Sequence, residues 1–267
     1  MPLERSYLFV PGERPERFDK AVATGADRVI VDLEDAVRPD HKEAAREALA
    51  TWSGRTEAVV RINGMDSPWF EGDVATVGRT GVTRVMVPKA EPEVLRVVRR
   101  ELGSGVEIIA LIESVAGLMQ STQICADGEV GRLAFGNLDF SLDAGIDETD
   151  RELDPVRLRL VLESRYARLP PPIDGVFPSL ADPTALALRV ARAKALGFGG
   201  KLCIHPGQVE SVNLGFLPGA DELAWAERVI AAVEEAGGGA VSLDGKMVDR
   251  PVVERARVLL VGGRRAT

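Results

Sequence analysis

Eight short apolar segments alternate with amphipathic segments along most of the chain, and this alternation limits the folds open to it. The apolar segments are rich in β-branched residues and cover residues 6–10, 28–33, 58–62, 84–88, 107–112, 132–136, 174–178 and 201–205. Nearly continuous apolar strands separated by helices predict a parallel sheet covered by helices. Eight strand–helix repeats are the number that closes a (β/α)₈ TIM barrel, which we expect over residues 1–220. An open doubly wound sheet is the alternative, but the sequence lacks its glycine-rich dinucleotide turn.

The pattern changes after residue 220. Residues 221–267 begin within a long helical segment, continue through a glycine-rich stretch with a short strand, and end in another helix. These pieces exceed what eight repeats need. We therefore expect residues 221–267 to form a C-terminal extension that covers an active site. The family resemblance described below favours the active site of a neighbouring subunit. The three glycines at 237–239 are expected to act as a flexible tether.

Composition excludes several classes of protein. The chain has 267 residues and a formal net charge of −8, which argues against a general nucleic-acid-binding surface. The first 18 residues are charged where a signal peptide needs an apolar core, and no segment is long and apolar enough to span a membrane. The two cysteines have no metal-ligand spacing. We expect a cytoplasmic protein with no nucleic-acid or membrane partner.

Charged side chains follow the expected strands at their C-terminal ends, where barrel enzymes hold their reactive groups. The positions are Arg61, Lys89, Glu113, Asp139 and His205, together with Asp32, Glu34 and Asp35 after the second strand. Glu113 follows five apolar residues, and a buried carboxylate is costly unless it is paired or holds a cation.

Glu113 and Asp139 are expected at the ends of successive strands, facing each other across the barrel mouth. Two carboxylates without histidine or cysteine partners form a hard-oxygen site that suits Mg²⁺. The alternative, a structural salt bridge to Arg61 or Lys89, stays open.

The acids after the second strand offer a rival metal site. Strand alternation would send Asp32 and Glu34 to one side and Asp35 to the other. We favour supporting roles for these acids, in which they orient an arginine or water. His205 lies before a proline, so its backbone matters as much as its ring, and we do not assign it as a base.

Seven segments together resemble one family. They read SYLFVPGERPERFDKA, VDLEDAV, VRING, VPKAE, LIESVAGL, KLCIHPGQV and LDGKMVDRPVVERAR, and they run from Ser6 to about Arg257. Each alone is a weak signal, but in this order they resemble the citrate lyase β-subunit-like proteins, relatives of malyl-CoA and citramalyl-CoA lyases in the HpcH/HpaI aldolase superfamily.

The resemblance implies a trimeric barrel that uses Mg²⁺ to make or break a C–C bond in a 3-hydroxyacyl-CoA thioester, with a small oxo-acid as the other product. It implies Glu113 and Asp139 as metal ligands and Arg61 as the group that holds a substrate carboxylate or carbonyl oxygen. Glu34, Asp35 and Lys89 are expected to support these residues. The implied thioester-binding positions are Phe9, Arg14, Lys20, Ile204 and His205, and Asp249 is implied as an acid supplied by the C-terminal segment.

Two positions depart from the pattern of relatives. Leu138 and Ser179 stand where relatives often carry acids, so the identity of the substrate is not inherited. Three functions remain open: a free-standing acyl-CoA lyase, the β-subunit of a citrate lyase complex acting on an acyl-carrier-protein thioester, and a non-catalytic binder of CoA thioesters.

Overall fold

The computed structural model describes residues 3–236 and 241–263, which form two compact units. The first is Leu3–Asn213, and the second begins at Leu214, in the last turn of α10 (Val209–Gly215). The expected glycine tether at 237–239 lies outside the described residues.

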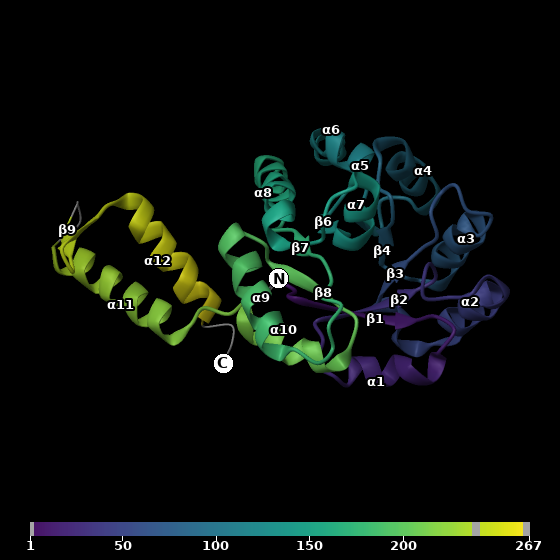
Figure 1. The fold of residues 1–267 in the computed structure, drawn as a ribbon, viewed down its shortest axis with the longest axis horizontal. Helices are drawn as coiled ribbons and strands as arrows, with labels where there is room; N and C mark the ends of the chain where they lie inside the picture. The colour runs from purple at the N-terminus through teal and green to yellow at the C-terminus, as the bar shows by residue number, and fades with distance from the viewer. Residues whose placement is uncertain (1–2, 237–240, 264–267) are drawn as a thin grey trace. The chain divides into compact units, whose positions relative to one another are not determined.

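The first unit is a closed barrel of eight parallel strands in sequence order, and the predicted (β/α)₈ fold is confirmed (Figure 1). The strands are β1 Ser6–Pro11, β2 Arg28–Asp32, β3 Val59–Arg61, β4 Arg84–Val87, β5 Glu107–Ile112, β6 Arg132–Phe135, β7 Ile173–Asp174 and β8 Gly200–Cys203. The seventh was expected at 174–178 but has only two residues and ends where Gly175 begins the next loop.

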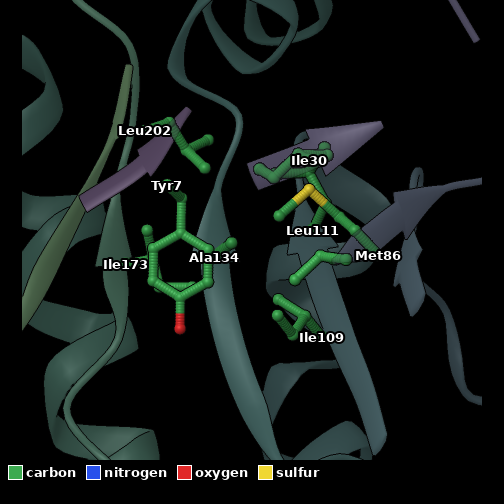
Figure 2. Close-up of a cluster of buried hydrophobic side chains, with 9 residues drawn as sticks. Tyr7, Ile30, Met86, Ile109, Leu111, Ala134, Ile173 and Leu202 are labelled. Atoms are coloured by element: carbon green, nitrogen blue, oxygen red, sulfur yellow. The ribbon is translucent and has the colours of Figure 1, made fainter. Parts of the chain in front are cut away.

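Side chains from all eight strands fill the barrel (Figure 2). Strand residues alternate between the interior and the helix layer, so each strand sends only some of its apolar residues inward. The interior cluster consists of Tyr7, Ile30, Val59, Met86, Ile109, Leu111, Ala134, Ile173 and Leu202. The barrel is therefore a packed core, and ligands must bind at its ends.

Helices surround the strands (Figure 1). They are α1 Phe18–Val22, α2 Lys42–Thr51, α3 Phe70–Thr80, α4 Pro92–Leu102, α5 Val115–Met119, α6 Ser121–Ala126, α7 Asn137–Ala144, α8 Asp150–Tyr166, α9 Pro183–Leu196 and α10. Short 3₁₀ turns precede α1 (Pro15–Arg17), α2 (Pro39–His41), β3 (Ser53–Thr56) and α10 (Pro206–Gln208).

The sequence predicts one helix over 117–127 and another that begins at Pro155, and the structure differs at both. The segment 117–127 divides into α5, which ends at Met119, and α6, and Ser114 caps α5 by accepting a hydrogen bond from the Gly117 N–H. Helix α8 begins five residues before Pro155, which we expected at its start. A proline this close to the N-terminal end of a helix removes only one backbone hydrogen bond, and the helix tolerates the loss.

The second unit is a helical hairpin with a small sheet. Helices α11 (Ala220–Glu235) and α12 (Arg250–Gly263) share an apolar core with the antiparallel strands β9 (Val241–Leu243) and β10 (Lys246–Val248). Asp244 and Gly245 join the strands with positive φ angles of 51° and 74°, the conformation of a tight hairpin turn. The sequence indicated one strand here, and the structure has two.

No helix in the described part of the chain is long and apolar enough to cross a membrane.

Candidate active site

A cavity of about 390 Å³ opens at the C-terminal ends of the barrel strands. Its lining comes from β1, β2, β3, β5, β6 and β8 and from residues that follow β2, β5, β6, β7 and β8. The lining residues are Phe9, Pro11, Asp32, Asp35, Ala36, Arg61, Leu111, Glu113, Phe135, Gly136, Asn137, Leu138, Asp139, Val176, Leu202 and Ile204. Phe9, Arg61, Glu113, Asp139 and Ile204, all predicted site residues, therefore share one cavity.

Glu113 follows β5 directly and is 4% exposed. Its Oε1 accepts a hydrogen bond from the backbone N–H of Lys89 at 2.8 Å. Burial raises the pKa of Glu113 to about 7, and the nearby charge of Asp139 adds to this rise. The carboxylate is thus held at a position where its charge is not balanced by the protein alone.

The absence of a side chain at Gly136 makes room for Glu113. A Cβ at Gly136 would lie 2.5 Å from Cβ and 2.8 Å from Oε2 of Glu113, which no side chain allows without displacement. Lys89, on the other side, holds its N–H toward Glu113 in a backbone conformation with φ of 46°, uncommon for a residue other than glycine. The role expected of Lys89 falls to its backbone, because its ammonium is exposed and lies 3.9 Å from Asp66.

We expected Asp139 to end a strand, and this expectation is wrong. It lies in the first turn of α7, four residues after β6 ends, and it is exposed toward the cavity. The sequence indicates α7 only weakly, because its four apolar residues alternate with polar ones and its buried positions include Asn137 and Ser141.

Three acids surround Arg61. Asp32 accepts hydrogen bonds from Nε and Nη2 at 2.8 and 2.7 Å. Oε2 of Glu34 lies 3.0 Å from Nη1, close enough for an ion pair although not oriented as a hydrogen bond, and Oδ2 of Asp35 lies 3.5 Å from Nη1. The expectation that Asp35 points away is wrong, because β2 ends at Asp32 and strand alternation does not extend beyond it.

Glu34 is nearly buried, and it lies near Glu113 as well as Arg61. Burial raises the pKa of Glu34 to about 8, although the Arg61 charge opposes the rise. Burial therefore disfavours the charged form of Glu34, against the attraction of the Arg61 guanidinium 3.0 Å away.

A buried network that sequence reasoning missed supports the acidic loop. The ammonium of Lys42 donates to the carbonyls of Leu33 and Glu34 and to Oδ1 of Asn63, each at 2.7 Å. Asn63 donates in turn to the Leu33 carbonyl and to Asp73 at 2.8 and 2.6 Å. The signal in the sequence was weak, since a lysine at the start of a helix is ordinarily solvated.

The remaining predicted residues lie elsewhere. Arg14 and Lys20 are exposed outside the cavity lining, and Arg14 donates to Glu16 at 2.8 Å. His205 is exposed, and its Nδ1 accepts from the Gly207 N–H at 3.1 Å. Asp249 belongs to the second unit, where its Oδ1 lies 3.4 Å from the Val252 N–H at the start of α12.

The lining suits a small cation that prefers oxygen ligands and takes few of them from the protein. It does not suit a metal that needs many protein ligands. Within residues 3–236 and 241–263, no group of three or more His, Cys, Asp or Glu side chains is arranged to hold a metal. A pair of carboxylates is nevertheless the usual protein contribution for Mg²⁺, which keeps water or substrate in its other positions. The burial of Glu113 beside Asp139, which the Lys89 N–H and the Arg61 charge offset only in part, is the observation that favours such a cation.

The fold and the lining define a (β/α)₈ barrel with an acid-rich site at the C-terminal ends of its strands. Residues 5–206 match the family described as HpcH/HpaI aldolase/citrate lyase, and the chain belongs to this family.

Two curated relatives differ in their chemistry. The chain is 35% identical to the citrate lyase subunit beta of Leuconostoc mesenteroides subsp. cremoris, over 96% of this chain and 91% of that protein. It is 31% identical to a (3S)-malyl-CoA thioesterase of Cereibacter sphaeroides, over 96% and 93%.

Solved structures agree with the family. The protein CitE from Mycobacterium tuberculosis, in complex with magnesium, acetoacetate and coenzyme A, has a TM-score of 0.88 and 33% identity over 98% of both chains. A citrate lyase beta subunit from M. tuberculosis, complexed with oxaloacetate and magnesium, has a TM-score of 0.73 and 32% identity over 81% of this chain and 98% of that one.

Proposed function

We propose that this protein is a Mg²⁺-dependent carbon–carbon lyase acting on a 3-hydroxyacyl-CoA thioester such as malyl-, citramalyl- or citryl-CoA. The observation that carries the proposal is the convergence of Glu113, Asp139 and Arg61 on one cavity at the barrel mouth. The magnesium, acetoacetate and coenzyme A bound by the similar M. tuberculosis protein support it.

Glu113 and Asp139 would hold the cation. When bound, Mg²⁺ supplies a Lewis acid that polarises the oxo-acid oxygen and lowers the pKa of the substrate hydroxyl. Glu113 is buried and positioned by the Lys89 N–H, so it fixes one side of the site, whereas the exposed Asp139 is free to adjust to the ligand.

The reaction needs no oxidant or reductant. The bond between C2 and C3 of the thioester breaks, its electron pair remains on C2 as the acetyl enolate, and the hydroxyl oxygen becomes the oxo-acid carbonyl after losing its proton. A proton then adds to C2 to give acetyl-CoA. Arg61 can donate to the enolate oxygen, and burial strengthens this interaction. Asp249 is our candidate for the proton exchange at C2.

The CoA portion of the thioester would bind around the rim of the cavity. Phe9 and Ile204 belong to the lining, and the Gln208 side chain fixes Ile204 by accepting from its N–H at 2.9 Å. Arg14, Lys20 and His205 are exposed, as groups that contact a flexible phosphate-bearing chain need to be. We propose that they contact the CoA portion and that the protein is a homotrimer.

Thioester hydrolysis is the second candidate, favoured by the similarity to the malyl-CoA thioesterase. It would use the same cation and cavity but would release free CoA thiol. The similarity to a citrate lyase subunit keeps a third possibility open, in which the thioester is carried by an acyl-carrier protein. A non-catalytic CoA-thioester binder would retain binding alone.

The test is an assay of the purified protein with malyl-, citramalyl- and citryl-CoA, in Mg²⁺ or in EDTA, that measures both 2-oxo acid and free thiol. We expect Mg²⁺-dependent 2-oxo acid and acetyl-CoA without thiol release. Glu113→Gln should abolish the activity. Glu107→Gln, an acid at the exposed opposite end of the same strand, should retain it. Thiol release would favour hydrolysis, and a Glu113→Gln protein that is fully active in EDTA would refute the metal assignment.

A further inference from the structure

The loop after β7 takes its hydrogen bonds from buried side chains. Strand β7 has only two residues, so the carbonyls that follow it lie beyond the ladder of the sheet. The buried ammonium of Lys201 donates to the Gly175 carbonyl at 2.6 Å, and the Gln208 side chain donates to the Phe177 carbonyl at 2.8 Å. Lys201 also donates to Oδ2 of the buried Asp174 at 2.6 Å. These bonds fix the position of Gly175.

Asn137 occupies the space that a side chain at Gly175 would need. A Cβ at Gly175 would lie 1.9 Å from Oδ1 and 2.6 Å from Cγ of Asn137, well inside contact distance. Gly175 does not have a positive φ, so packing and not backbone conformation requires a glycine there. Asn137 is 1% exposed, and its Oδ1 has no hydrogen-bond partner among the described residues. A buried amide oxygen without a donor is costly, so hydrogen bonding does not explain this contact.

The contact lies at the beginning of α7. Asn137 is the first residue of the helix, and Asp139 follows it by two residues. Gly136 at the N-cap has no side chain to hold the first turn, in contrast to the Ser114 cap of α5. The packing of Asn137 against Gly175 therefore ties the first turn of α7 to the loop after β7.

We propose that Asn137, packed against Gly175, is a positioning residue that sets the place of Asp139 in the cavity. This rests on the proposed role of Asp139 as a ligand of the cation. A shift of the first turn of α7 would move Asp139 relative to Glu113, and metal–ligand distances tolerate only about 0.2 Å. The side chain of Asp139 stays exposed, and Asn137 sets where its backbone lies.

Titration calorimetry of the intact protein with Mg²⁺ tests this role. Gly175→Ala places a methyl group against the Asn137 amide and should raise the Kd for Mg²⁺ about tenfold or more, the scale for residues that support metal ligands. Adding Asn137→Ala frees the space for the methyl group, so the double variant should bind Mg²⁺ more tightly than Gly175→Ala alone. The recovery should be partial, because the added Cβ still lies 2.9 Å from the Phe135 carbonyl. An unchanged Kd in Gly175→Ala, or no recovery in the double variant, would overturn the proposal.

Gly199→Ala is the matched control for crowding. A Cβ at Gly199 would lie 2.4 Å from Cδ2 of Leu3 and 2.9 Å from Cβ of Pro171. Gly199 directly precedes β8, at the opposite end of the barrel strands, and is outside the cavity lining. The variant should lower the unfolding temperature without changing the Kd for Mg²⁺. A Kd that rises as much as in Gly175→Ala would reduce the effect to lost stability and contradict the positioning role.

A second comparison stands even if Gly175→Ala fails to fold. Asn137→Ala leaves a hollow against Gly175 and should raise the Kd for Mg²⁺ about threefold or more, less than a direct clash does. Ser141→Ala, one turn further along α7, also removes a buried oxygen that has no partner among the described residues. Ser141 is outside the cavity lining, and its variant should leave the Kd unchanged. Equal Kd values for the two variants would exclude a role specific to Asn137.

Failure of this inference and failure of the proposed function give different results. If the unaltered protein binds no Mg²⁺ and cleaves no thioester, the proposed function is lost. Hydrogen exchange of the backbone amides of residues 140–144, measured without Mg²⁺, still tests the contact: Gly175→Ala should speed exchange, and the double variant should slow it again. If Gly175→Ala binds Mg²⁺ and cleaves thioesters as well as the unaltered protein does, the function stands and the inference is lost.

Discussion

At the scale of single residues, the site is governed by carboxylates whose charges are not fully balanced. Glu34 and Glu113 are both buried, and burial is the main reason that their pKa values rise, to about 8 and about 7. Arg61 opposes the rise but is shared among three acids. This arrangement costs stability, and a cation bound in the cavity, as we propose, would offset part of that cost.

The raised pKa of Glu34 predicts a pH dependence of stability in metal-free buffer. Between the unfolded value of 4.5 and the folded value of about 8, the folded state holds the proton and the unfolded state does not. The contribution of Glu34 is therefore complete below pH 4.5 and is lost as pH rises to about 8. The loss is on the order of a few kcal/mol.

Glu34→Gln should remove this loss. Denaturant unfolding of both proteins in EDTA between pH 5 and pH 9 measures the difference. We expect the Gln variant to gain stability relative to the unaltered protein as pH increases, with the gain levelling off above the folded pKa of about 8. Parallel stability profiles would show that Glu34 ionises normally.

At the scale of elements, the loop after β2 is held by a helix and a neighbouring strand. Lys42 at the start of α2 binds the carbonyls of Leu33 and Glu34, and Asn63 after β3 binds the Leu33 carbonyl from another direction. This loop carries the acids that surround Arg61. The network therefore sets where Arg61 and its partners lie, although none of its side chains lines the cavity.

Lys42→Met should lower activity more than its effect on folding explains. It leaves the Glu34 carbonyl and Asn63 Oδ1 without their donor and removes one of the two donors to the Leu33 carbonyl. Each unsatisfied group costs about 1–3 kcal/mol. We expect kcat to fall at least about tenfold, the scale of a positioning defect.

Arg132→Met is the matched control for Lys42→Met. Arg132 is equally buried and donates to Pro171 O, Glu4 O and the Tyr7 hydroxyl, away from the cavity lining. It should lose similar stability with little change in kcat. Thermal unfolding measures the loss of stability, and steady-state kinetics measure kcat. Equal kcat losses in the two variants would exclude a positioning role for Lys42.

At the scale of the whole molecule, the proposed cation ligands Glu113 and Asp139 lie in the barrel and Asp249 lies in the second unit. We propose that Asp249 acts in the active site of a neighbouring subunit of a trimer. The proposal comes from the sequence resemblance and from the position of Asp249 beyond the eight repeats. The second unit has a hydrophobic core of its own, shared by α11, α12, β9 and β10, which orders the segment that carries Asp249.

Complementation tests this arrangement. Glu113→Ala and Asp249→Ala proteins should each be nearly inactive, and co-refolding them should restore activity. With random assortment in a closed ring, roughly a quarter of the sites would combine intact Glu113 with a neighbour's intact Asp249. A mixture of Glu113→Ala with the double variant lacks such sites and should stay inactive. If mixing restores nothing although subunits exchange, Asp249 does not act across the interface.

The sequence by itself determined the barrel and most of the residues at its mouth. Strand and helix periodicities are local properties of the chain, and eight repeats leave one closed parallel arrangement, so Arg61, Glu113 and Asp139 could be assigned to the same end of the barrel. The resemblance added roles that spacing alone could not supply.

Only the tertiary structure decided how the charges of these residues are balanced. The convergence of Asp32, Glu34 and Asp35 on Arg61 depends on how the chain turns after β2, which alternation does not describe. The burial of Lys42, the space at Gly136 that admits Glu113, and the place of Leu138 in the cavity depend on contacts between segments distant in sequence. Burial and charge balance are properties of the folded surroundings, and they set the pKa values and the cavity surface on which the chemistry of the site depends.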